Sequence, residues 1–221
     1  MVTLKNNYNI QRLSVIKIME MRIVEEQTDI KYSKEQSNPF STGGGGVNYE
    51  IYVQTNFTCC MLLGWNIPGM HGGCIDLIKL QGRYEGYDVD DCVLYFENES
   101  NKSKLMCQIK HSLALTENDK TFKDVLTSAW NNYNNKELFD ENKDCIALVV
   151  AGLSATDIKN ARMILEWART CDNEEEFIKK IYTPGFSSKD KQKKYEAFKN
   201  HIITANSANV VLSRQTYRFN S

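Results

Sequence analysis

Apolar and polar positions alternate along the chain in two patterns, one typical of helices and the other of strands. Apolar side chains recur at spacings of three and four over residues 47–63, which predicts an amphipathic helix. Residues 92–96 and 105–109 are short apolar runs joined by a polar turn, which predicts a hairpin. Residues 144–152 contain an unbroken apolar run, as is typical of a strand covered on both faces.

Weaker patterns fill the rest of the chain. Residues 13–24 favour a strand or a short helix, and residues 206–221 favour a strand or a lead into something absent from this chain. The remaining predicted elements are a strand over residues 75–81 and helices over residues 122–133, 154–169, 174–182 and 187–205. This order predicts an α/β fold in which helices cover a sheet.

The second strand of the predicted hairpin has two different faces. Gln108 and Lys110 fall on one face, because alternate side chains of a strand point the same way. The opposite face carries Leu105, Cys107 and Ile109. Burial of the apolar face would present an amide and an ammonium group together, which suggests a functional site; an amphipathic strand with a solvated face is the alternative.

Composition narrows the class of protein. The chain has 221 residues, of which 42% are hydrophobic and 25% charged, with a net charge of −1. It is long enough to fold as one domain, or one domain with an appendage, without help from disulfides or a metal. No overall basic excess indicates a nucleic-acid partner, although a local patch would suffice to bind one.

Cysteine usage and hydropathy indicate a cytoplasmic protein with no membrane partner. The seven cysteines form no CxxC pair, and His71 with Cys74 lacks a matching second half-site, so structural zinc is disfavoured. Free cysteines in apolar runs suit a reducing compartment. The first residues carry no signal peptide, and no run approaches the roughly 20 apolar residues of a spanning helix.

A series of short motifs carries a family resemblance. Glu50 falls in the first predicted helix, Asp88, Asp90 and Asp91 precede the first hairpin strand, and the Gln108-x-Lys110 pair follows. This order resembles the PD-(D/E)XK nuclease superfamily, whose variant with Gln-x-Lys is similar to the double-stranded DNA endonuclease domain of CD-NTase-associated antiphage effectors. The same domain type begins some bacterial antiviral STAND NTPases. The supporting motifs are GGGGVNYEIYVQ (43–54), GYDVDD (86–91), CQIKHS (107–112) and AWN (129–131), within residues 42–170.

The resemblance implies a fold and a domain organisation. The expected fold is a restriction-endonuclease-like core with a mixed β-sheet flanked by helices. Residues 1–41 would form a weakly defined N-terminal segment, residues 42–172 the nuclease core, and residues 173–221 a helical, Lys-rich C-terminal extension that could lead to a further domain. The four glycines at 43–46 lack the Gly-Lys-Ser/Thr ending of a phosphate-binding P-loop.

The resemblance also implies a metal site for Mg²⁺ or Mn²⁺. Asp91 would be the main ligand, with Asp90 and then Asp88 as alternatives that the sequence leaves open. Glu50 would approach from the helix as a metal or water ligand, although a favourable interaction with the helix dipole in the first turn explains it equally well. The main-chain carbonyl of Ile109 would complete the ligands.

Two side chains on the second strand complete the implied catalytic set. Gln108 stands where the superfamily usually has an acid; it offers a carbonyl oxygen without charge, which puts a tight two-metal site in doubt. Lys110 would polarise the attacking water or neutralise the phosphate, a role that suits a compact ammonium group.

The implied function is that of an Mg²⁺-dependent endonuclease that cleaves double-stranded DNA in antiphage defence. Its activity would depend on a homo-oligomer or on an ATPase or sensor module, fused or separate. Lys191, Lys193 and Lys194 could contact DNA phosphates, or could form a solvated helix face. The alternative function is a catalytically inactive module of the same fold that binds DNA or a partner protein.

Overall fold

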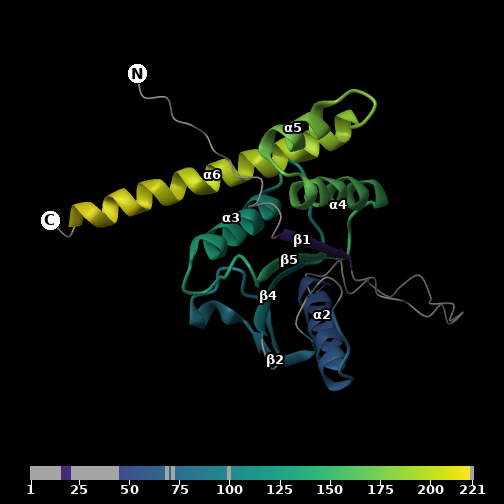
Figure 1. The fold of residues 1–221 in the computed structure, drawn as a ribbon. Coiled ribbons are helices and arrows are strands. Elements are labelled where there is room, and N and C mark those ends of the chain that lie inside the picture. The colour runs from purple at the N-terminus through teal and green to yellow at the C-terminus, as the bar shows by residue number, and fades with distance from the viewer. Residues whose placement is uncertain (1–15, 21–44, 68–69, 71–72, 99–100, 220–221) are drawn as a thin grey trace, which may run out of the picture. The chain divides into compact units, whose positions relative to one another are not determined.

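The computed structural model describes residues 16–20, 45–67, 70, 73–98 and 101–219, which form two compact units (Figure 1). One unit contains the described residues of 18–113 together with residues 143–153 and holds most of the sheet. The other contains residues 16–17, 114–142 and 154–219, and apart from the two residues of the first strand its regular elements are helices.

The sheet is mixed. Its strands are β1 (Ile16–Glu20), β2 (Ile75–Leu80), β3 (Cys92–Asn98), β4 (Asn101–Lys110) and β5 (Cys145–Val150), in the order β1-β5-β4-β3-β2. The strands β2, β3 and β4 pair antiparallel, whereas β4 and β5 pair parallel. The predicted hairpin, the predicted strand at 75–81 and the buried strand at 144–152 are therefore confirmed, as is the α/β class.

Register brings two strand ends together. Cys92 pairs with Cys107, so the residue before β3, Asp91, is level with the last residues of β4. On the other side of β4, Lys110 pairs with Val150. The start of β3 and the end of β4 therefore share one edge of the sheet, where side chains from both can meet.

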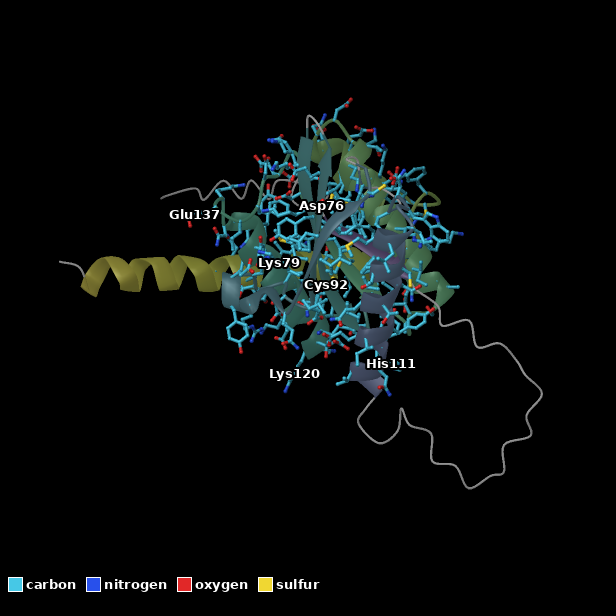
Figure 2. The ribbon with its side chains drawn as sticks, turned by 90° about the horizontal axis from the view of Figure 1, so that it is seen from below. Asp76, Lys79, Cys92, His111, Lys120 and Glu137 are labelled. Atoms are coloured by element: carbon cyan, nitrogen blue, oxygen red, sulfur yellow. The ribbon has the colours of Figure 1, made fainter. Side chains whose placement is uncertain are left out.

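One long helix, α2 (Gly45–Leu62), packs on a single face of the sheet (Figure 1). Its buried side chains, Tyr49, Val53 and Phe57, recur every four residues, so they determine which face of the helix packs against the sheet. The ring of Tyr49 meets that of His111 edge-on at 5.9 Å, and Figure 2 labels His111 beside the helix. The sheet residues beneath α2 include Cys92, Leu94, Phe96, Leu105, Cys107, Ile109, Ala147 and Val149.

The position of Glu50 in this helix differs from the predicted one. Since α2 begins at Gly45, Glu50 lies in its second turn, and the first turn holds no acidic residue. The favourable charge–dipole interaction falls off within the first turn of a helix. The helix dipole therefore does not explain Glu50, and the earlier start of the helix corrects that interpretation.

The second unit consists of α3 (Lys120–Asn134), α4 (Ala155–Thr170), α5 (Glu174–Tyr182) and α6 (Lys189–Phe219). Phe122 and Phe198 meet edge-on at 5.0 Å between α3 and α6. The first three helices begin at side-chain caps, in which Asp119, Ser154 and Asn173 accept backbone hydrogen bonds. No helix in the described ranges is both long and apolar enough to cross a membrane.

The C-terminal part of the chain differs from the predicted one. The helix α6 continues to Phe219, so the prediction of a strand over residues 206–221 is wrong. The compact units group α3 and α4 with α5 and α6 rather than with the sheet, and the domain boundary at residue 172 stays a prediction. Amphipathic helices that pack on a common partner helix produce this grouping. The order of the elements along the chain does not predict which helices pack together.

Candidate active site

One carboxylate oxygen accepts hydrogen bonds from three donors at the end of the sheet where β3 begins and β4 ends. Asp91 Oδ2 accepts from Gln108 Nε2 at 2.5 Å and from the backbone N–H of Ile109 at 2.6 Å. Lys110 Nζ lies 3.2 Å from the same oxygen and forms an ion pair with it. Donors and a cation around one oxygen hold the carboxylate in a fixed orientation.

A short turn fixes the main chain just before Asp91. The 3₁₀ helix η2 (Gly82–Glu85) follows Gln81, which adopts φ 53°, and the backbone N–H of Gly82 donates to the Asp90 carbonyl at 2.8 Å. A β-carbon at Gly82 would lie 3.0 Å from the Tyr87 ring, so the close packing there favours glycine. This packing sets where β3 begins.

The turn also separates Asp90 from Asp91. Asp90 points to Arg83, with Nε 3.0 Å from Oδ2, and its carboxylate is therefore neutralised away from the β4 residues. Asp91 points to the end of β4, because consecutive side chains of an extended chain face opposite ways. Asp88 is half-buried and has its own interactions. Among the three aspartates, these contacts favour Asp91 as the site residue.

Glu50 reaches the same edge from α2 through an intermediary. Gln54 Nε2 donates to Glu50 Oε1 at 2.9 Å and to the main-chain carbonyl of Asp91 at 3.1 Å. One amide group thus connects the helix carboxylate to the residue that opens β3. Sequence reasoning assigned Gln54 no role, although its i,i+4 spacing from Glu50 on a helix was a usable signal.

Electrostatics confirm that Glu50 is near the Asp91 cluster. Partial burial raises the pKa of Glu50 above its usual value, and the negative charge of Asp91 raises it further. The hydrogen bond from Gln54 and the positive charge of Lys110 act in the opposite direction on the same pKa. Glu50, Asp91 and Lys110 therefore form one electrostatically coupled group, and the charge of Asp90 makes a smaller contribution that also raises the pKa of Glu50.

Gln108 and Lys110 share a face of β4, as predicted, but they are not equally exposed. Gln108 is 6% exposed, whereas the Lys110 side chain is 32% exposed. The alternative of a fully solvated strand face is therefore wrong for Gln108. Its amide nitrogen donates to Asp91, so Gln108 acts here as a donor that orients the carboxylate.

The cluster offers only part of a metal coordination shell. Within the ranges that the structure describes, no three His, Cys, Asp or Glu side chains gather closely enough to hold a metal ion. Mg²⁺, however, is commonly bound by one or two carboxylates while it keeps several waters. Asp91 and Glu50 supply two hard oxygen ligands, which fits such a cation. The Ile109 carbonyl as a ligand stays a prediction.

The lysines predicted to contact DNA lie in α6, in the other unit. Lys191 is 5% exposed and stacks over the Trp167 ring at 4.4 Å; its burial lowers its pKa. Lys194 is also buried, and its Nζ lies 2.6 Å from Asp157. These protein contacts do not support the two as phosphate ligands. Lys193 is exposed, and its role as a DNA contact stays a prediction.

No family model, curated protein or solved structure matches this chain.

Proposed function

We propose that the sheet-containing unit is a metal-dependent endonuclease domain with a restriction-endonuclease-like core that cleaves double-stranded DNA. The observation that supports this proposal most strongly is the meeting of Asp91 and Lys110 at one sheet edge, coupled to Glu50 through Gln54. Carboxylates from a helix and a strand beside a lysine on the next strand can hold a divalent cation and stabilise charge, which suits metal-dependent phosphodiester hydrolysis.

Asp91 and Glu50 are the residues that would hold Mg²⁺ or Mn²⁺. A bound divalent cation supplies charge stabilisation and an acidified water at neutral pH. Asp91 Oδ2 accepts three hydrogen bonds, so its second oxygen, Oδ1, is the one left to face a ligand. Glu50 engages Gln54 through Oε1, and its Oε2 accepts no hydrogen bond from the described residues.

Lys110 would act on the phosphate or on the attacking water. Its ammonium is a compact charge with three donors, and the Asp91 contact at 3.2 Å uses only one of them. The half-exposed side chain can therefore turn a second donor to a phosphate oxygen while Asp91 keeps it in place. Stabilisation of developing charge by a fixed donor is typically the largest single contribution to such catalysis.

Gln108 limits how many cations this site would take. A carboxylate at its position would add a negative charge beside Asp91, whereas the amide donates to Asp91 instead. Fewer negative ligands favour a single, weakly bound cation over a pair. The proposed enzyme therefore uses one cation at a time.

The biological setting is proposed from the family resemblance. The domain would act in the cytoplasm of a bacterium as an effector of antiphage defence. An uncontrolled nuclease would damage its host, so cleavage would await an oligomer or an ATPase or sensor module. Backbone contacts with little base reading would hold the DNA.

A second candidate function, a catalytically inactive module that binds DNA or a partner protein, is favoured by one specific contact set. Asp91 Oδ2 is saturated by Gln108, Ile109 and Lys110, so the ammonium already neutralises the carboxylate without any metal. In an inactive descendant of a nuclease, these contacts would stabilise the fold without a bound metal ion.

One assay separates the two functions. The full chain is incubated with supercoiled plasmid and Mg²⁺ or Mn²⁺, before and after EDTA, in each oligomeric state that gel filtration resolves. We expect nicked and linear products that EDTA suppresses and that Lys110→Ala abolishes. Unchanged cleavage by Lys110→Ala would refute the assignment, and DNA binding without cleavage in every state would favour the inactive module.

A further inference from the structure

Gln54 makes two contacts that no other described side chain combines. Its single amide nitrogen donates one hydrogen to Glu50 Oε1 at 2.9 Å and the other to the Asp91 carbonyl at 3.1 Å. Both acceptors are oxygens, so the amide orientation is fixed, and both donor positions of the nitrogen are in use. The side chain is half-buried beneath the cluster.

The position of Gln54 follows from the packing of α2. Tyr49 and Val53, each next in sequence to one partner of the Glu50–Gln54 pair, are fully buried against the sheet. Their burial turns Glu50 and Gln54 together to the side of the helix that borders the start of β3. The two side chains are four residues apart and therefore neighbours on the helix surface.

The two contacts restrict different motions. Glu50 has a long side chain, and holding one oxygen reduces the rotamers that its carboxylate can sample. The contact to the Asp91 carbonyl fixes the main chain from which the Asp91 carboxylate projects. A single amide therefore links the Glu50 carboxylate on the helix to the main chain that carries Asp91 at the start of the strand.

We propose that Gln54 is a positioning residue that holds Glu50 and Asp91 at the spacing required for one divalent cation. This inference rests on the proposed function, since it concerns the same site. Groups that orient ligands without touching the metal typically contribute about 10–100-fold to metal affinity or activity. A purely structural tether between helix and sheet would contribute to folding stability alone.

The decisive variant is Gln54→Met, which keeps the length of the side chain and removes both donors. Mn²⁺ affinity is measured by calorimetry on EDTA-stripped protein, and thermal unfolding is measured without metal. We expect the affinity for Mn²⁺ to fall by about 10–100-fold. Gln54→Asn keeps the amide but is one methylene shorter, so it cannot span both acceptors and should lose affinity similarly.

The matched control is Asn56→Leu. Asn56 also carries an amide on α2, where its Nδ2 donates to the Tyr52 carbonyl at 2.9 Å. This bond touches neither Glu50 nor Asp91. The variant should therefore bind Mn²⁺ as the wild type does, even if its unfolding temperature falls as far as that of Gln54→Met.

The outcomes distinguish this inference from the proposed function. Weaker Mn²⁺ binding by both Gln54 variants, with unchanged binding by Asn56→Leu, supports the positioning role. Wild-type affinity in Gln54→Met or Gln54→Asn overturns the positioning role while leaving the metal site intact. Failure of the wild-type protein to bind Mn²⁺ overturns both the positioning role and the metal-dependent function.

Discussion

Two aspartates flank β4, and their surroundings differ in a way that identifies the candidate site. Asp91 immediately precedes β3 and Asp144 immediately precedes β5. Asp144 accepts the backbone N–H of Lys104 at 2.8 Å and lies 3.3 Å from Lys104 Nζ. Asp91 makes the same two kinds of contact with Ile109 and Lys110 at the other end of the strand.

Exposure and neighbours separate the two pairs. The Asp144 side chain is 3% exposed and that of Lys104 is 21% exposed, against 15% and 32% for Asp91 and Lys110. At Asp91 a helix adds a second carboxylate, Glu50, whose pKa is raised by burial and then by the charge of Asp91. An Asp–Lys pair is therefore insufficient to indicate catalysis; an added acid and an exposed lysine make it a candidate.

The largest effect on stability is expected at the buried pair. Asp144→Ala removes the acceptor of the Lys104 backbone N–H and the carboxylate that pairs with the Lys104 ammonium. Removal of one member of a buried pair costs about 3–5 kcal/mol of unfolding free energy. Urea unfolding should show this loss for Asp144→Ala and a smaller one for Asp91→Ala, which is more exposed. Equal losses would mean that the two pairs are alike structurally.

The largest effect on activity is expected at the exposed pair. Lys110→Ala should lower the rate of Mg²⁺-dependent plasmid cleavage by about 100–1000-fold, the usual cost of losing one charge-stabilising donor. Lys104→Ala is the matched control on the same strand, and its rate should change by only a few-fold provided that the protein stays folded. A comparable loss in both variants would remove the functional distinction between the pairs.

An acid at position 108 would sharpen the comparison further. Gln108→Glu replaces the donor to Asp91 Oδ2 with a buried carboxylate that repels it. Loss of a buried hydrogen bond costs about 1–3 kcal/mol, so the metal-free variant should unfold at lower urea. Saturating Mn²⁺ should recover part of that loss, because it would now bind an additional carboxylate. Loss of stability without any recovery by Mn²⁺ would count against a cation at this edge.

The smallest expected effect concerns the pH dependence of stability. The pKa of Glu50 is raised in the folded protein, so folding loses stability as the pH rises above the ordinary pKa of a glutamate, and the loss is complete once the pH exceeds the raised pKa. Glu50→Gln removes this cost and should raise the unfolding temperature of the metal-free protein at neutral pH. The gain should disappear as the pH falls below the ordinary pKa of a glutamate. A gain that persists unchanged in acid would contradict the assignment.

The elements were predictable where a single periodicity dominated. In β5, the residues on both faces of the strand are mostly buried, which matches its unbroken apolar run. In α2, apolar residues recur every three or four positions, which is the helical pattern. The tail beyond residue 205 lacked such a pattern, and the helix α6 extends through it. The start of α2 was also missed by two residues, because glycines are poor helix formers and mask a helix boundary.

The candidate site was predictable in composition but not in detail. Glu50, Gln108 and Lys110 were identified from the family resemblance, which depends on the order of the motifs along the chain. The shared face of Gln108 and Lys110 followed from the alternation of side chains along a strand. The choice of Asp91 over Asp90 depends on Arg83, whose pairing arises from a turn with a positive φ at Gln81. Contacts of this kind depend on the folded backbone, so the order of residues along the chain does not predict them.

For the lysines of α6, the sequence predicted an exposed charged surface, whereas the structure buries two of them. A Lys-rich run predicts a charged surface, but Lys191 lies over the Trp167 ring and Lys194 pairs with Asp157, both from α4. Long aliphatic stems allow lysines to pack while their charges find partners. Partners from a different helix cannot be foreseen from the charge pattern of α6 alone.

The central claim is that Asp91 and Glu50 together bind a divalent cation beside Lys110. A crystal structure of the protein grown with Mn²⁺ tests this claim most directly, since manganese is located by its anomalous scattering. We predict a peak within ligand distance of the Asp91 and Glu50 carboxylates, close to the roughly 2.0–2.2 Å typical of such small divalent ions. Saturating Mn²⁺ that gives no peak between these carboxylates, or a peak only at other acids, would contradict the account.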